Sequence, residues 1–226
     1  IGTGLVGSEM CIRDSVKEAR EFAQSFVKRG MKLVDIAEKI EEKIRELGAD
    51  VAFPVNTSMN EIAAHKTPLP GDETVAEGIL KIDIGASVDG YIGDTAITID
   101  VSENKEFEEM IALNLKLLNA AKETVSKDME VRDVGEAVSN TLSEYNVMNE
   151  KNYTIISGLT GHCLDKDTIH ASPSIPNYAN AIDKKLVGRA FAVEPFVTTG
   201  SGEIYEGEGG GIYALQNESG RVRDRD

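Results

Sequence analysis

The sequence predicts an α+β fold, because helical and strand patterns follow one another in blocks. Two segments with helical spacing come first, then a pair of alternating apolar strands, then two more helices and two apolar strand segments. This order favours α+β over a regular βαβ repeat, in which strands and helices alternate. The 226 residues, 41% of them hydrophobic, suffice for a sizeable core and for one large domain or two small ones.

The chain is expected to open with two helices. Ser15 can cap the first, whose apolar residues recur at helical spacing until Gly30 ends it. A second helix is predicted over residues 34–47, with Gly48 at its C-cap position. Residues 52–58 follow as an extended segment.

A β-hairpin is predicted over Ile79 to Val101. Apolar residues alternate on both sides of the pair Asp89-Gly90. An Asp-Gly pair between two alternating runs is a good short-range signal for a tight hairpin turn.

Two helices and two strands are predicted after the hairpin. Apolar spacing indicates a long helix over Glu106 to Ser126, and Asp133 is predicted to cap the next helix. The segments Tyr153 to Ser157 and Ala190 to Thr198 are apolar with β-branched residues, so we expect both to be strands.

The two ends of the chain lack these patterns. Residues 1–15 have no basic start and no continuous apolar centre, so they are not a secretory signal. We interpret them as non-native sequence left by cloning or read assembly, and we interpret the charged, unpatterned residues 217–226 in the same way. One domain is therefore expected over residues 16–216.

Composition excludes several classes of partner. The chain has 24 basic and 39 acidic residues, a formal net charge of −15, whereas nucleic acids and anionic membranes attract basic surfaces. No apolar run approaches the roughly 20 residues of a membrane span. Two cysteines, Cys11 and Cys163, are too few for a disulfide framework. A reducing, cytoplasmic location is therefore expected.

Asp83 and Asp94 stand in opposing arms of the predicted hairpin. Two carboxylates on paired strands can point at one spot, and divalent cations bind such oxygen ligands. Both acids lie inside apolar runs, where burying a carboxylate is costly unless it is paired or metal-bound. The pattern indicates a metal site, although two solvated strand acids would show the same spacing.

The three histidines of the chain are His65, His162 and His170. Imidazole is the commonest transition-metal ligand and the usual proton carrier near neutral pH. Each of them alone could equally be a structural or an exposed histidine. Cys163, next to His162, is interpreted as a buried thiol rather than a nucleophile.

Glu194 lies in the middle of an apolar strand segment, Phe191 to Phe196. An acid in that position suggests a ligand, whereas the neighbouring Pro195 favours a strand end that faces solvent.

These candidate residues occur in order within four stretches that resemble the type II methionine aminopeptidases in their archaeal form. The resemblance runs from about Val16 to about Gln216 and implies the pita-bread metallopeptidase fold. The four stretches are AFPVNTSMNEIAAHKTP (52–68), KIDIGASVDGYIGDTA (81–96), GLTGHCLDKDTIHASPSIPN (158–177) and FAVEPFVTTGSG (191–202).

The resemblance implies four metal ligands. Asp83 and Asp94 match the two bridging or chelating aspartates of the family. His162 matches its single histidine ligand, and Glu194 matches a glutamate ligand that can also carry a proton. The cofactor implied is a pair of divalent ions, for which Co, Mn, Fe, Zn and Ni are the candidates.

The resemblance also implies substrate contacts. His65 matches the histidine that contacts the scissile amide or its leaving nitrogen, and His170 matches the second active-site histidine, near the substrate carbonyl. Phe53 and Ile169 match positions that line the pocket for the methionine side chain. The implied activity is removal of the N-terminal methionine from nascent polypeptides by a cytoplasmic, monomeric metallo-exopeptidase.

The chain departs from the family at its C-terminal end. The family has a fifth ligand, a second glutamate on a late strand, and no glutamate after Glu194 has that context. We therefore interpret the chain as truncated and expect it to be weakly active or inactive. The glutamates that lack the strand context are Glu203, Glu206, Glu208 and Glu218.

Two other functions stay open from the sequence. One is a different pita-bread aminopeptidase that cleaves X-Pro bonds, although those enzymes carry an extra N-terminal domain. The other is a non-catalytic pita-bread protein that binds partners, although such relatives typically lose metal ligands or substrate histidines.

Overall fold

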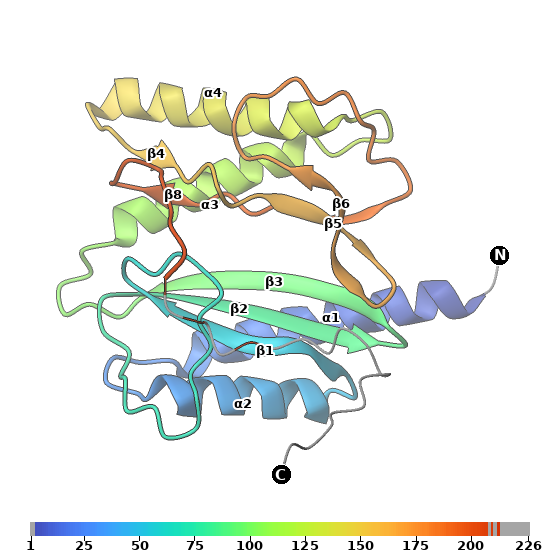
Figure 1. The fold of residues 1–226 in the computed structure, drawn as a ribbon, viewed down its shortest axis with the longest axis vertical. Helices are drawn as coiled ribbons and strands as arrows, with labels where there is room; N and C mark the ends of the chain where they lie inside the picture. The colour runs from blue at the N-terminus through green and yellow to red at the C-terminus, as the bar shows by residue number, and fades with distance from the viewer. Residues whose placement is uncertain (1–2, 208, 210–211, 213–226) are drawn as a thin grey trace, which may run out of the picture.

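The computed structural model describes residues 3–207, 209 and 212, so the predicted tail 217–226 lies outside the described residues. Figure 1 shows two layered halves, each a three-stranded antiparallel sheet with two helices on one side. The fold is therefore α+β, as expected. The first half contains α1 (Thr3–Phe26), α2 (Leu33–Glu46), β1 (Asp50–Met59), β2 (Ile79–Val88) and β3 (Tyr91–Asp100).

The second half repeats the arrangement with shorter strands. Its sheet has the order β6-β5-β7, and a separate pair of strands, β4 and β8, lies beside it. The elements are α3 (Glu108–Glu123), α4 (Val131–Asn149), β4 (Thr154–Ile155), β5 (Gly161–Asp165), β6 (Thr168–Ile175), β7 (Ala190–Ala192) and β8 (Val197–Thr198).

Each half has its own hydrophobic core. Alternate residues of β2, among them Leu80, Ile82 and Ile84, are fully buried against the helices of the first half. The second core joins the inner faces of α3 and α4 to side chains that include Cys163 and Ile175. The helices cover the outer faces of the two sheets, so the opposite sheet faces are turned toward each other (Figure 1).

The predicted hairpin is confirmed over its whole length. β2 and β3 pair antiparallel from Ile79 opposite Asp100 to Val88 opposite Tyr91. The turn residues Asp89 and Gly90 have φ angles of 55° and 81°. Two successive positive φ angles are typical of a type I′ turn, whose twist matches that of the strands.

The start of α1 differs from the prediction. The helix begins at Thr3, and Ser15 lies inside it, 5% exposed, rather than at its N-cap. Ile12, Val16, Ala19 and Ala23 are buried at helical spacing, so the apolar stripe extends into residues 1–15, the segment interpreted as non-native sequence. The interpretation of residues 1–15 as non-native sequence stays a prediction.

Two later boundaries also differ. α4 begins at Val131 with Glu130 as its N-cap, so the prediction of Asp133 as the cap is wrong. Asp133 instead completes a capping box, in which its carboxylate accepts a 2.7 Å hydrogen bond from the backbone N–H of Glu130. The strand expected over residues 190–198 is split into β7 and β8, which is consistent with Pro195 because proline cannot donate to a strand ladder.

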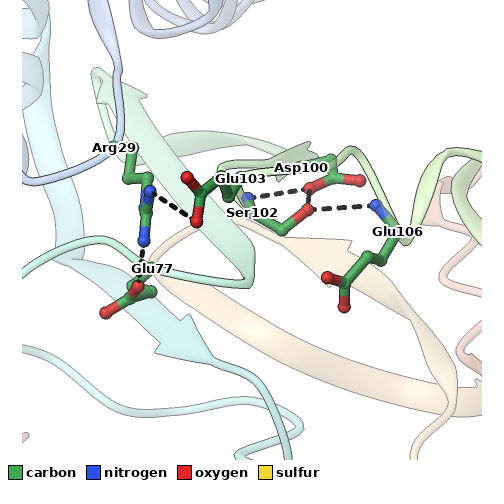
Figure 2. Close-up of polar contacts among 6 residues, drawn as sticks. All are labelled: Arg29, Glu77, Asp100, Ser102, Glu103 and Glu106. Carbon is green, nitrogen blue, oxygen red and sulfur yellow. Dashed lines mark hydrogen bonds and ion pairs between the residues drawn. The ribbon is translucent and has the colours of Figure 1, made fainter.

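A buried aspartate fixes the connection between the two halves. Asp100, 6% exposed, ends β3 and accepts hydrogen bonds from the backbone and hydroxyl of Ser102 and from the backbone N–H of Phe107. Burial opposes ionisation of Asp100, but these hydrogen bonds outweigh it and lower its pKa. Figure 2 shows the Asp100–Ser102 part of this network beside the exposed ion pairs from Arg29 to Glu77 and Glu103.

No helix of the described part of the chain is both long enough and apolar enough to span a membrane.

Asp100→Asn is expected to lower the free energy of unfolding by about 1–3 kcal/mol, because the amide nitrogen that replaces Oδ2 cannot accept the hydrogen bond from the partly buried N–H of Phe107. The matched control is Glu103→Gln, which removes an exposed ion pair and should cost less than about 1 kcal/mol. Chemical denaturation measures both.

The effect of Asp100→Asn should depend on pH in one direction. The folded-state pKa of Asp100 is lowered, so its stabilisation is present above the unfolded-state pKa and is lost as the pH falls through the folded-state pKa. The stability difference between the wild type and Asp100→Asn should therefore shrink in acid. A difference that grows in acid would contradict this role of the carboxylate.

Candidate metal centre

Asp83 and Asp94 lie on the same face of the first sheet. In the ladder Asp83 faces Ala96 and Asp94 faces Gly85, so the two acids are diagonal neighbours across β2 and β3. Because strand residues alternate between faces, burial of Ile82 and Ile84 on the helix side turns Asp83 toward the second half. The hairpin register thus presents both carboxylates at the interface between the halves.

The second half supplies His162 and Glu194 to the same place. His162 Nε2 lies 3.4 Å from Asp94 Oδ2 and 3.0 Å from Glu194 Oε1. One ligand atom from each of these three residues lies within 4.8 Å of the others, which is the spacing of a metal site. His162 is on β5, and Glu194 follows β7, which pairs with β5 through Ala192 opposite His162.

The chemistry of this group of residues fits a divalent cation. Glu194 Oε1 is buried and accepts no hydrogen bond of acceptable geometry within the described residues, despite its 3.0 Å approach to His162. Burial, followed by the charges of Asp94 and Glu194, raises the pKa of Asp83 to about 8. Three carboxylates and one imidazole are a donor set that a hard or borderline cation would satisfy.

His162 is oriented as metal-binding histidines are. Its Nδ1 lies 3.1 Å from the carbonyl oxygen of Cys163. In the neutral ring this contact places the proton on Nδ1 and leaves a lone pair on Nε2, facing Asp94 and Glu194. Burial lowers the pKa of His162, but the nearby carboxylates of Asp94 and Glu194 outweigh burial and raise the pKa to about 10.

The other two histidines lie beside His162. The rings of His162 and His170 meet edge to face with centroids 4.6 Å apart, and the His65 ring is 6.1 Å from that of His170. Burial, together with the charges of His162 and His65, lowers the pKa of His170. His65 adopts a left-handed backbone conformation with φ 61°, an uncommon one for residues other than glycine that is often found at functional sites.

Phe53 lies on the ligand-bearing face of the first sheet. It pairs with Gly85 across β1 and β2, and a Cβ atom on Gly85 would fall 2.2 Å from the Phe53 ring. The ring therefore covers Gly85, the residue opposite Asp94. Ile169 is half-buried and precedes His170 on β6. Neighbouring strand residues normally point to opposite faces, so a place for Ile169 in the same pocket stays a prediction.

One polar residue in this region ends the third stretch that resembles the family, but its role was not predicted from the sequence. Asn177 is fully buried after β6, and its side-chain amide donates a 2.6 Å hydrogen bond to the backbone oxygen of Glu194. Its position between Pro176 and Tyr178 carries no periodic or charge signal. Only the three-dimensional contact reveals it.

Comparison with known proteins shows the family of the chain. The model of metallopeptidase family M24 matches residues 11–223. The methionine aminopeptidase of Pyrococcus horikoshii is 41% identical over 194 residues, which cover 84% of this chain and 63% of that protein. The chain thus spans 63% of the length of the first curated relatives that it matches.

Solved structures have the same fold. A methionine aminopeptidase from Thermotoga maritima superimposes with a TM-score of 0.77 at 24% identity, over 89% of this chain and 83% of that one. An X-Pro aminopeptidase from the same organism gives a TM-score of 0.65 at 22% identity, over 86% of this chain and 54% of that one. The expected pita-bread fold and the resemblance to archaeal methionine aminopeptidases are confirmed.

Asp94→Asn and His162→Ala are expected to lower the amount of divalent metal retained by the folded chain, because each change removes a ligand atom from the group of three. Elemental analysis after incubation with Mn²⁺ or Co²⁺ and desalting measures the stoichiometry. Asp50→Asn, at an exposed acid that begins β1, is the matched control. Unchanged stoichiometry in Asp94→Asn and His162→Ala would contradict the ligand assignment.

Metal affinity is expected to rise with pH. His162 has a raised pKa of about 10 and Asp83 one of about 8, so near neutral pH a cation must displace protons from both groups. We expect at least about a tenfold gain in affinity per pH unit below pH 8, with proton release on binding. Calorimetric titration with Mn²⁺ in buffers of different ionisation enthalpy measures both. An affinity independent of pH would show that these groups bind no cation.

Proposed function

Since the chain belongs to metallopeptidase family M24, we propose that it carries the metal-binding and substrate-binding part of a methionine aminopeptidase. The reaction is hydrolysis of the first peptide bond of polypeptides that begin with methionine. The observation that carries the proposal is the convergence of Asp94, His162 and Glu194 from two halves of the fold, beside Asp83. The curated relatives named methionine aminopeptidase support the substrate.

Asp83, Asp94, His162 and Glu194 are proposed to hold two divalent ions, for which Co, Mn, Fe, Zn and Ni are the candidates. When bound, such ions supply Lewis acidity, which polarises a carbonyl and makes water a nucleophile near neutral pH. The protein keeps His162 in the tautomer that exposes Nε2, through the contact of Nδ1 with Cys163.

Glu194 is the proposed proton carrier. Its Oε1 is buried and accepts no hydrogen bond of acceptable geometry from the described residues, so it can take a proton from an attacking water. The same carboxyl group can then return the proton to the leaving amine. Its 31% side-chain exposure, against 8% for His162, leaves it the more accessible of the two to a substrate.

His170 and His65 are the proposed substrate contacts. The lowered pKa of His170 keeps its ring neutral at pH 7, so one ring nitrogen can donate a hydrogen bond to the substrate carbonyl without adding a charge. His65, 6.1 Å away between ring centroids, is proposed to contact the scissile amide or its leaving nitrogen.

Phe53 and Ile169 are proposed to line the pocket for the methionine side chain. An unbranched thioether fits a narrow apolar pocket and makes favourable contacts with an aromatic ring. One additional methylene in such a pocket changes binding by only about 1–3 kcal/mol, so bulkier side chains must be rejected by shape.

The proposed setting follows from this substrate. Nascent polypeptides carry their initiating methionine in the cytoplasm, so a cytoplasmic location is proposed. The net charge of −15 supports a protein partner rather than a nucleic acid. A monomer is proposed because one chain contributes Asp83, Asp94, His162 and Glu194 to the same place.

Incubation of the chain with a Met-Gly-X peptide and excess Mn²⁺ or Co²⁺ tests the proposed function. We expect methionine release that depends on metal and disappears in Asp94→Asn, which keeps the shape of the side chain and removes its charge.

Two results would overturn the activity itself. Release that is no greater than in Asp94→Asn would favour a non-catalytic binding protein. Faster cleavage of X-Pro peptides than of Met-Ala peptides would favour the proline-specific peptidases, which share the fold.

A further inference from the structure

Asn177 connects two backbone segments that lead to metal-ligand candidates. Its side-chain Nδ2 donates to the backbone oxygen of Glu194 at 2.6 Å and lies 3.4 Å from that of Leu159. Leu159 leads into β5 and His162, whereas Glu194 follows β7. The side chain is fully buried, so no water-exposed group competes for these contacts.

The Glu194 segment needs such support because it lies outside the strand ladders. The pairing of β5 with β7 ends at Ala192 opposite His162, and the pairing of β4 with β8 involves Val197 and Thr198. The backbone oxygen of Glu194 therefore accepts from a side chain instead of from a neighbouring strand. A carbonyl held away from water without a donor is destabilising.

A close backbone approach holds the other end of this segment. A Cβ atom on Gly161 would fall 2.3 Å from the carbonyl oxygen of Ala192, so β5 and β7 can approach this closely only with glycine at position 161. Gly161 directly precedes His162, and Ala192 is two residues before Glu194. The relative position of the two ligands is thus set by Gly161 on one side and by Asn177 on the other.

The side-chain oxygen of Asn177 indicates which part of the amide group is required. Its Oδ1 is buried and has no hydrogen-bond partner within the described residues. A buried, unpaired amide oxygen is a destabilising feature. If position 177 served packing alone, an apolar residue would fit there better. The unpaired amide oxygen of Asn177 therefore indicates that the N–H donors of the side chain are required.

We propose that Asn177 is a positioning residue that holds the backbone of Glu194 so that its carboxylate faces His162. The proposal rests on the metal site of the proposed function. It assigns Asn177 no contact with substrate or metal, and its effect on the site passes through Glu194.

The test is a double-mutant cycle on the affinity for Co²⁺, measured by calorimetry and by the visible absorption of the bound ion. Asn177→Ala is expected to weaken Co²⁺ binding by about 10–100-fold, the usual effect of removing a group that orients a ligand. In a Glu194→Gln background the same change should weaken binding by less than about twofold, because coupled residues lose their effect together. The absorption spectrum should change in Asn177→Ala as it does in Glu194→Gln.

Asn180→Ala is the matched control. Asn180 lies in the same loop and makes two hydrogen bonds, to the Tyr178 oxygen at 2.9 Å and from the Ile182 N–H at 3.0 Å, neither of which reaches a ligand. Its loss should lower stability without changing Co²⁺ affinity or spectrum. If Asn177→Ala does not fold, Asn177→Ser takes its place, since a shorter hydroxyl cannot span both carbonyls.

Four outcomes decide between these possibilities. Wild-type affinity in the folded Asn177 variant would overturn the proposal, and so would an equal loss in the wild-type and Glu194→Gln backgrounds, which indicates a merely structural role. A wild-type chain that binds no Co²⁺ would overturn the metal site, and the positioning role with it. Wild-type binding together with the coupled loss would support both.

Discussion

The gathering of carboxylates at one place, partly out of solvent, is the physical constraint on which the candidate site depends. Asp83, Asp94 and Glu194 lie around a single imidazole. Burial, followed by the charges of Asp94 and Glu194, raises the pKa of Asp83 to about 8, and the pKa of His162 is raised to about 10, so both groups favour bound positive charge. A fold that served stability alone would keep these acids apart or in solvent. The arrangement becomes favourable when divalent cations replace the protons.

The architecture supplies the proposed ligands from two halves with separate hydrophobic cores. Asp83 and Asp94 are fixed by the register of one hairpin, whereas His162 and Glu194 depend on β5, on β7 and on the segment held by Asn177. Each set is rigid within its own half, because each half has its own hydrophobic core. Cation binding should therefore also strengthen the contact between the halves, since it connects ligands that no single core holds together.

The features of the fold and of the candidate site that could be predicted from the sequence are those set by residues close together in the chain. The Asp89-Gly90 turn and the alternation around it predicted the hairpin, and the hairpin alone predicted that Asp83 and Asp94 share a face. These are local rules of turn geometry and strand period. The meeting of Asp94 with Glu194 depends instead on the packing of two halves, which no local pattern encodes, and only family resemblance anticipated it.

The sequence predictions that the structure does not bear out each have a physical cause. The first helix begins at Thr3 and not after Ser15, and its buried apolar stripe continues to Ile12, in a segment that we interpreted as non-native. Asp133 was expected to be the N-cap of α4. It lies instead three residues after the N-cap Glu130, and its carboxylate accepts the hydrogen bond from the backbone N–H of Glu130 that completes a capping box. Asn177 was overlooked because a buried side chain that serves another residue's backbone leaves no signature in composition or spacing.

Anomalous diffraction from crystals of the chain grown with Co²⁺ or Zn²⁺ tests the central claim most directly. The account predicts an anomalous peak within about 2.0–2.2 Å of His162 Nε2 and of carboxylate oxygens from Asp94 and Glu194. A peak elsewhere on the protein, with Asp94, His162 and Glu194 still contacting one another directly, would contradict it.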